Sequence, residues 1–455
     1  MKKKIIVVGL GVLILGSVLI IPTIIIISMA NNPPSWIYTT DDEVASVDIS
    51  ANGEWIVANS IPITTLPSPR NLMVFKKESA TIQWTFPISA YPSSGMRVAI
   101  SADGNYIAAT DFYETIYLFD TTSGTQLWNY TTTGAISTIA ISHNGDYIAV
   151  GGHVGPTSTT RIYLFNKLSP IPIWNTTDFG YQVDISSNGE YIISANTEDM
   201  YLFHRSSANP VVNYSIPLSS TLIYSAVISS DASRVAVGYH DYHLAVYPQL
   251  VETQSWNYHT NGFIYDVDIS GDGSYIVAGS GDDNVYLFDS MSSIPLWTYQ
   301  TGDEVWSVAI SEDGNYIVAG SDDDSIYLFN RNFSSPLEIV STNGNIRTVE
   351  ISDNGRYSIA GNSEGEIFFL DRDNPYFTID YLSFYMTFIQ YYAIISALMI
   401  AGLVISTFTL RAIRKRREVY KEEILEEERL SIEFIESLDK EYKKWDEKNG
   451  TKKED

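Results

Sequence analysis

The chain has 455 residues, 45% of them hydrophobic, so it can bury a substantial core and does not belong to the disordered class. Its formal net charge of -26 disfavours binding to phosphate backbones, so we predict no nucleic-acid partner and favour cations or basic partners. The absence of cysteine excludes disulfides, thiolate nucleophiles, iron–sulfur clusters and cysteine-based zinc sites.

The first predicted element is an apolar segment, residues 5–30, which follows Lys2, Lys3 and Lys4 and contains no charged residue. At about 1.5 Å per residue, a helix of this length exceeds the ~30 Å hydrocarbon core of a bilayer. We predict that residues 1–30 are an uncleaved transmembrane anchor. The alternative is a cleaved signal peptide, because Ser28-Met29-Ala30 resembles a small-residue cleavage site.

Between residues 31 and 378 one pattern recurs, in which Ile-Ser is followed after two residues by a turn glycine. The fifth copy is degenerate, with Ala232 in place of glycine, and the eight anchor isoleucines are Ile49, Ile100, Ile141, Ile185, Ile228, Ile269, Ile310 and Ile351. Self-similarity at roughly 40 to 50 residues indicates a propeller or a repeat array.

The strands predicted within one unit distinguish a propeller from a repeat array. Short strands are predicted at 297–299, 305–310, 316–319 and 326–329, and four short strands per unit are typical of one propeller blade. Asp-Gly and Asn-Gly pairs, such as Asp313-Gly314, supply the positive φ that a tight turn needs. The sequence therefore predicts an all-β, eight-bladed β-propeller in which residues 36–40 form the outer strand of the eighth blade and close the ring.

Two stretches of the repeat resemble known families. Asp-Gly-Asn-Tyr-Ile-Val-Ala-Gly-Ser at 313–321, followed by Ile-Tyr-Leu-Phe-Asn at 326–330, resembles WD40 repeats. Residues 116–128, Ile-Tyr-Leu-Phe-Asp-Thr-Thr-Ser-Gly-Thr-Gln-Leu-Trp, look like the repeat of PQQ-like propellers, the quinoprotein alcohol dehydrogenase-like superfamily. Both resemblances imply the propeller fold. The quinone cofactor is not implied, because those enzymes use a pair of adjacent cysteines; we predict no cofactor and no catalytic residue.

Acidic residues supply the candidate metal ligands. The position before the anchor isoleucine is acidic in four blades, at Asp48, Asp184, Asp268 and Glu350. If these side chains face the propeller axis, they could form a partial carboxylate ring that holds Ca²⁺. The alternative, which we favour, is that they accept hydrogen bonds from the backbone of neighbouring strands. The acidic turns at 282–283 and 322–324 are interpreted as solvated loops.

Four sequons, at Asn129, Asn175, Asn213 and Asn332, lie on or next to predicted outer strands. A glycan at these positions would reach solvent, so we predict a glycoprotein.

Near the C-terminus, residues 379–410 are predicted to form a transmembrane helix that begins with an aromatic belt and is followed by a basic cluster starting at Arg411. Since basic residues stay on the cytoplasmic side, the propeller is expected outside the cytoplasm and residues 411–455 inside, as a charged helical tail. Ile435, Leu438, Tyr442 and Trp445 form a short apolar stripe on this tail, either for contact with a partner or the bilayer or simply on a solvated helix.

These features together predict a cell-membrane protein whose extracytoplasmic propeller is a protein- or glycan-binding scaffold or receptor. One alternative is an enzyme with its site in the channel, a quinone- or metal-dependent oxidoreductase. A second alternative is an assembly factor for membrane proteins.

Overall fold

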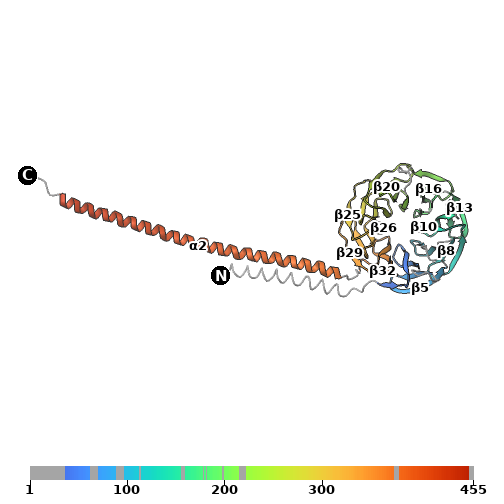
Figure 1. Ribbon diagram of the computed structural model, residues 1–455, viewed down its shortest axis with the longest axis horizontal. Helices are drawn as coiled ribbons and strands as arrows, with labels where there is room; N and C mark the ends of the chain where they lie inside the picture. The colour runs from blue at the N-terminus through green and yellow to red at the C-terminus, as the bar shows by residue number, and fades with distance from the viewer. Residues whose placement is uncertain are drawn as a thin grey trace, which may run out of the picture. The chain divides into compact units, whose positions relative to one another are not determined.

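The computed structural model describes residues 36–61, 70–88, 97–111, 114–154, 159–177, 179–180, 182–196, 199–214, 222–373 and 379–449. The chain divides into two compact units, residues 1–378 and 379–455. In the first unit the strands form eight four-stranded antiparallel sheets arranged as a ring (Figure 1). The eight-bladed β-propeller predicted from the sequence is confirmed.

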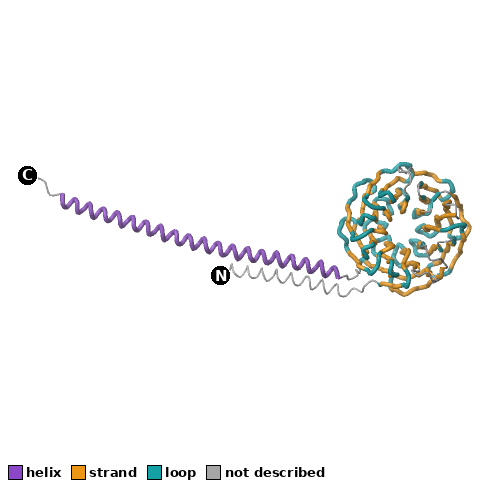
Figure 2. The backbone as a smooth tube through the Cα atoms, viewed as in Figure 1, coloured by secondary structure: helices purple, strands orange, loops and turns teal. Residues whose placement is uncertain are grey.

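Seven blades are made of four strands that follow one another in the chain. First strands such as β10 and β26 lie toward the centre of the ring in Figure 1, and Figure 2 shows the same view with strands and loops in different colours. In chain order the strands of blades 1 to 7 are β2 (Glu43–Ile49), β3 (Trp55–Ile61), β4 (Arg70–Lys76), β5 (Ser79–Ile88); β6 (Val98–Ile100), β7 (Tyr106–Thr110), β8 (Thr115–Asp120), β9 (Gln126–Thr131); β10 (Ile136–Ile141), β11 (Tyr147–Val154), β12 (Thr159–Asn166), β13 (Ser169–Thr177); β14 (Gln182–Ile185), β15 (Tyr191–Ala195), β16 (Met200–His204), β17 (Pro210–Tyr214); β18 (Ile223–Ile228), β19 (Arg234–Tyr239), β20 (His243–Pro248), β21 (Trp256–His259); β22 (Ile264–Ile269), β23 (Tyr275–Ser280), β24 (Asn284–Asp289), β25 (Trp297–Gln300); β26 (Val305–Ile310), β27 (Tyr316–Ser321), β28 (Ser325–Asn330) and β29 (Glu338–Ser341).

The eighth blade joins the two ends of the repeat region. It contains β30 (Ile346–Ile351), β31 (Tyr357–Asn362) and β32 (Glu366–Asp371), and its outer strand is β1 (Ile37–Thr39). Strand β1 pairs antiparallel with β32, with Tyr38 opposite Ile367. The predicted closure by residues 36–40 is confirmed, and it removes the open edge that β32 would otherwise present.

The second strand of each blade is buried on both faces, because each blade is stacked between two others. In β27 every residue after Tyr316 is buried, so Ile-Val-Ala-Gly-Ser shows no alternation of buried and exposed residues. The glycine of this run lets the neighbouring blade approach. A Cβ on Gly320 would lie 2.3 Å from Cγ2 of Ile346, at the start of the first strand of blade 8.

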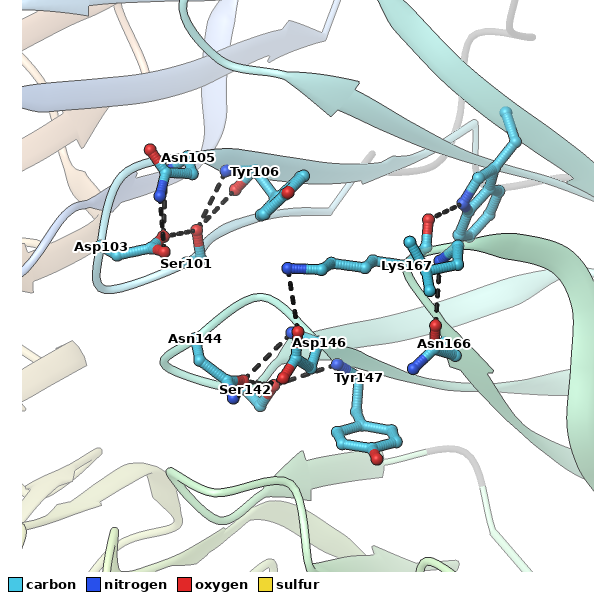
Figure 3. Close-up of polar contacts among 12 residues, drawn as sticks. Ser101, Asp103, Asn105, Tyr106, Ser142, Asn144, Asp146, Tyr147, Asn166 and Lys167 are labelled. Carbon is cyan, nitrogen blue, oxygen red and sulfur yellow. Dashed lines mark hydrogen bonds and ion pairs between the residues drawn. The ribbon is translucent and has the colours of Figure 1, made fainter.

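The Ile-Ser anchors mark a turn that is held by its own side chains (Figure 3). The Ser101 hydroxyl donates to Oδ1 of Asp103 at 2.6 Å and accepts from the Tyr106 N–H at 3.0 Å, while Gly104 has a φ of 71°. The same two hydrogen bonds occur in all eight blades, and the eight serines are fully buried: Ser50, Ser101, Ser142, Ser186, Ser229, Ser270, Ser311 and Ser352. In the degenerate fifth copy, Ala232 adopts a φ of 59° where the other copies have glycine.

The repeated tryptophans fasten six of the eight blades to the following one. Trp297 packs on Phe329 with ring centroids 5.2 Å apart, and its indole N–H donates to the Arg331 carbonyl at 2.7 Å. Five other tryptophans donate to the following blade in the same way: Trp36, Trp84, Trp128, Trp174 and Trp256. Trp36 belongs to the eighth blade and bonds to Lys77 of the first, so it also fastens the ring closure.

The second unit contains the helix α2 (Ile379–Asn449), which is continuous through the predicted tail. The side chains of Ile435, Leu438, Tyr442 and Trp445 are exposed on it. Among the helices that the structure describes, none meets the length and apolarity needed to cross a membrane. The first predicted membrane segment, residues 5–30, lies outside the described residues.

Candidate binding site at the central channel

The first strands of the eight blades line a central cavity of about 680 Å³. One end of this channel lies where the first strands begin, and the other end lies at the Ile-Ser turns that follow them. Backbone bonds between turns fasten the second end; for example, the Ala51 N–H donates to Ala102 of the next blade, and the Asp353 N–H donates back to Ala51. A volume of several hundred Å³ is typical of ligand sites.

Three of the four candidate metal ligands connect neighbouring blades. Asp268 accepts from the Ile269 N–H of its own strand and from the Ile310 N–H of the next blade, both at 2.8 Å. Asp48 makes the corresponding bonds to Ile49 and Ile100, and Asp184 makes them to Ile185 and Ile228. This is the backbone hydrogen bonding that the favoured alternative predicted.

The fourth candidate, Glu350, lines the cavity together with Asp48 and Asp184. Among the residues that the structure describes, no three His, Asp or Glu side chains are grouped so as to hold a metal ion. Calcium binding at the four candidate residues therefore remains a prediction from the sequence.

The channel wall contains a fifth carboxylate that the sequence reading missed. Asp266 lies in β22 and accepts from the Val308 N–H of the next blade at 3.0 Å and from the Ser225 hydroxyl of the preceding blade at 3.0 Å. Asp266 precedes Asp268 by two residues, so the period of two along a strand could have indicated it. We call Asp48, Asp184, Asp266, Asp268 and Glu350 the wall carboxylates; all but Asp268 line the cavity.

The wall carboxylates hold their protons more tightly than free carboxyl groups do. Loss of hydration raises the pKa of Asp268 to about 8 and that of Asp48 to about 7. The same cause raises the pKa of both Asp184 and Asp266 to about 6. The pKa of Glu350 is raised by burial and by the negative charges of Asp48 and Asp268. Asp48 and Asp268 are therefore partly protonated near neutral pH, and a cation that enters the channel would favour their charged form.

A β-bulge at the start of the first strand sets the shape of the strand-start end. In β26 the pairing with β27 shifts between Val305 and Ser307, so Trp306 is the extra residue. The shift recurs at Ala45, Ser137, Tyr224, Tyr265 and Arg347. A bulge re-aims one side chain, and here five of the extra residues line the cavity: the small Ala45 and four large side chains, Tyr224, Tyr265, Trp306 and Arg347.

These four large side chains, which we call the mouth arc, come from blades 5 to 8 and contact one another. The rings of Tyr265 and Trp306 are stacked with centroids 4.2 Å apart, and the Arg347 guanidinium lies 5.3 Å from the Trp306 ring. Tyr224 packs against Tyr265 at 5.7 Å. Trp306 is still 36% exposed, so its edge is accessible although Tyr265 and Arg347 stack on it.

Acidic groups surround the mouth arc. The Tyr265 hydroxyl donates to Oε2 of Glu304 at 3.0 Å. Arg347 is paired with Asp322 at 3.0 Å and with Glu43 at 3.4 Å. The only arginine in the mouth arc thus has two acidic partners, and the rim keeps an excess of negative charge.

The acidic turns that the sequence predicts as solvated loops also make hydrogen bonds that stabilise the fold. Asp282 accepts from the Tyr286 hydroxyl and from the Asn261 N–H, both at 2.8 Å. Asp323 does the same with Tyr327 and Gly302 in the next blade. The residue after each aspartate, Asp283 and Asp324, has a positive φ, of 66° and 64°. These aspartates therefore fix the turns to the connection that enters from the previous blade.

At the Ile-Ser-turn end, three side chains meet across the channel. The Ser230 hydroxyl donates to Oε2 of Glu312 at 2.9 Å and lies 3.5 Å from Nε2 of His143. A Cβ on Gly271 would lie 1.9 Å from Oε1 of Glu312, so this glycine provides the space for the carboxylate. The acid contacts the hydroxyl directly, whereas in a catalytic triad the imidazole stands between the two.

The four sequon asparagines are all exposed. Asn129, Asn175 and Asn213 occupy equivalent positions on the outer strands β9, β13 and β17, and Asn332 lies in the turn after β28. Glycosylation at these positions remains a prediction, but each side chain is accessible to a modifying enzyme.

The fold and its repeats define the class of protein, an eight-bladed β-propeller. The family described as "WD domain, G-beta repeat" matches residues 250–289 and 293–330. The chain is also similar to the crystal structure of the computationally designed Ika8 protein, with 12% identity and a TM-score of 0.61 over 74% of this chain and 100% of that one. A structure of the Dos1 propeller matches with 13% identity and a TM-score of 0.60, over 75% and 95% of the two chains. At these identities the likeness shows the fold alone. The comparison with curated proteins finds no match.

Proposed function

We propose that this protein is a membrane-anchored scaffold or receptor whose extracytoplasmic propeller binds a protein partner at the mouth arc. WD40 propellers are commonly protein-interaction scaffolds. The observation that supports the site is the recurrence of one β-bulge, which brings Tyr224, Tyr265, Trp306 and Arg347 from four consecutive blades to one end of the channel. Aromatic residues and arginine are the residue types that supply most of the binding energy at protein interfaces.

A protein partner suits the mouth arc better than a glycan does. A sugar ring stacks on an open aromatic face, but Tyr265 and Arg347 both stack on Trp306. What remains accessible is an aromatic edge beside acidic groups such as Glu304. An edge of this kind contacts apolar side chains and cationic groups of a peptide.

The membrane part of the proposal is supported by the sequence. Residues 5–30 and 381–410 contain no charged residue, and basic residues border each stretch on the side expected to face the cytoplasm. The exposed sequon asparagines on the outer strands agree with a propeller outside the cytoplasm.

Topology can be tested cleanly because the chain has no cysteine. Leu168 is 84% exposed on the propeller, and Ser437 lies on the tail. We expect Leu168→Cys to react with a membrane-impermeant maleimide on intact cells and Ser437→Cys to react only after permeabilisation. Labelling in the opposite pattern, or of both cysteines in intact cells, would contradict the proposed topology.

The binding site is tested by crosslinking in cells followed by affinity purification of the full chain and mass spectrometry. Trp306→Ala is compared with Phe333→Ala, a matched loss of an exposed aromatic that is 60% accessible on the turn after β28. We expect a partner that wild type and Phe333→Ala capture equally and that Trp306→Ala loses. A partner captured equally by all three would place binding elsewhere, and loss of binding in a glycan-processing mutant would favour a glycan ligand.

A further inference from the structure

We infer that the partner segment that docks at the mouth arc is basic, with lysine or arginine side chains reaching Glu304 at the rim and the wall carboxylates inside the channel. This inference rests on the proposed function and specifies the chemistry of its partner. The occupant to which it commits is a segment of a protein, in which the cations are attached to a chain that also contacts Trp306.

The shape of the mouth leaves room for such a segment. Blades 5 to 8 contribute large bulged residues, whereas blades 1 and 3 contribute Ala45 and Ser137 at the same position. At the bulged positions that the structure describes, the mouth therefore has large side chains in blades 5 to 8 and small ones in blades 1 and 3. The cavity of about 680 Å³ continues from the mouth arc to the turn residue Asp353, so an extended side chain can enter it.

The lining is complementary to a basic segment, because a cation that enters the channel lowers the raised pKa values of the carboxyl groups there and favours their charged form. Asp48, Asp184, Asp266, Glu350 and Asp353 line the cavity, against two arginines, Arg97 and Arg347. Arg347 is already paired with Asp322 and Glu43, so it leaves the negative excess at the mouth unbalanced. Complementary charge of this kind selects partners and speeds their association.

The distribution of the carboxylates favours long flexible cations over a metal ion. Asp48, Asp184 and Asp268 each bind two backbone N–H groups, which keeps them on their own blades around the ring. Among the described residues no three acidic or histidine side chains converge on one point. Lysine and arginine reach separate carboxylates and lay an apolar stem along an aromatic edge.

The test uses the full chain in phosphatidylcholine nanodiscs, whose zwitterionic surface does not itself attract a cationic peptide. The probe is a fluorescein-labelled peptide with four lysines spaced by glycine and serine. The control peptides replace lysine by acetyl-lysine or by glutamate. Binding is measured by fluorescence anisotropy at two salt concentrations, and spermidine is added as a competitor that carries the charge without a peptide chain.

Three variants separate the contributions of the rim and of the channel to peptide binding from a general effect of charge. Glu304→Gln and Glu350→Gln each remove one carboxylate, at the rim and inside the channel, and the amide oxygen introduced by Glu304→Gln would still accept the Tyr265 hydroxyl. Glu252→Gln removes the same charge from an exposed loop of blade 5 and serves as the matched control. Thermal unfolding of each variant shows whether it folds, and Tyr224→Ala replaces Trp306→Ala if the latter does not.

We expect wild type and Glu252→Gln to bind the lysine peptide equally, and Glu304→Gln, Glu350→Gln and Trp306→Ala each to weaken binding on the order of tenfold. Both control peptides should fail to bind, and added salt should weaken the lysine complex. Binding of the glutamate peptide, no effect of either glutamine variant, or spermidine competing as tightly as the peptide would overturn the inference. If capture of the cellular partner depends on Trp306 but the lysine peptide does not bind, the inference of a basic segment is wrong and the scaffold proposal stands. If capture of the partner does not depend on Trp306 and the lysine peptide does not bind, the inference and the scaffold proposal are both wrong.

Discussion

The two halves of the ring share one scaffold and differ at those bulged positions of the channel mouth that the structure describes. Both halves repeat the serine-held turn and the tryptophan that fastens a blade to the next. In blades 5 to 8 the bulged residues are Tyr224, Tyr265, Trp306 and Arg347, whereas blades 1 and 3 have Ala45 and Ser137 there. The repeated side chains therefore determine the fold, whereas the residue at the bulged position can vary and contact a partner.

The largest effect is expected from breaking the ring where the halves meet. Trp36→Ala removes the stack on Phe369, the contact with Phe75 and the hydrogen bond to Lys77. Truncation of a packed tryptophan costs about 3–5 kcal/mol, so the thermal midpoint should fall clearly. The control is Trp297→Ala, which loses equivalent contacts inside one half. An unchanged midpoint for Trp36→Ala would mean that the ring does not depend on this closure.

The next largest loss of stability is expected from overpacking at Gly320, where two blades approach closely. Gly320→Ala would place a methyl group 2.3 Å from Ile346, directly before the bulged Arg347, and overpacking of this kind costs ~1–3 kcal/mol. The matching position in blade 2 is Thr110, which already carries a Cβ and whose hydroxyl accepts from the Arg97 N–H at 3.3 Å, so that blade accommodates bulk where Gly320 leaves none. Chemical denaturation of Gly320→Ala measures the loss of stability. A variant as stable as wild type would show that the approach of blade 8 does not require this glycine.

The pH dependence of stability tests the wall carboxylates, which both halves contribute. The folded pKa values of Asp268, about 8, and Asp48, about 7, lie above the ordinary value of 3.8. The folded state therefore binds more protons than the unfolded state between about pH 4 and 8, and stability falls as pH rises through this window. Thermal midpoints should decrease from about pH 5 to about pH 8.5.

Asp268→Asn serves as the control for this trend. The variant no longer ionises, so its thermal midpoint should depend less on pH than that of wild type. Its stability at about pH 5 should be lower, because an amide N–H₂ would face one of the two N–H groups that Asp268 binds. A midpoint that rises with pH in wild type would refute the assignment.

The smallest effect is expected in the mouth arc itself. Arg347→Met removes two partly exposed ion pairs, which contribute at most about 1 kcal/mol to stability. The same change replaces the guanidinium over the Trp306 ring by a neutral thioether, so tryptophan fluorescence should shift while the thermal midpoint stays nearly constant. A large loss of stability would show that the arc supports the ring and is not free for recognition.

The sequence by itself determined the repeat. Eight Ile-Ser anchors, the glycine turns and the outer strand at residues 36–40 could be predicted, because each depends on residues close together in the chain or on an exact recurrence. The backbone role of Asp48, Asp184 and Asp268 was also foreseen, since a buried carboxylate needs donors nearby.

Only the tertiary structure decided which residues meet across blades. The bulges that aim Tyr265 and Trp306 at the channel depend on how the first strand pairs with the second, and one residue of shift changes which side chain faces inward. The contact of Ser230 with Glu312 joins residues 82 positions apart. Such contacts arise because the ring brings alternate blades to a common axis, and no local pattern in the sequence encodes that proximity.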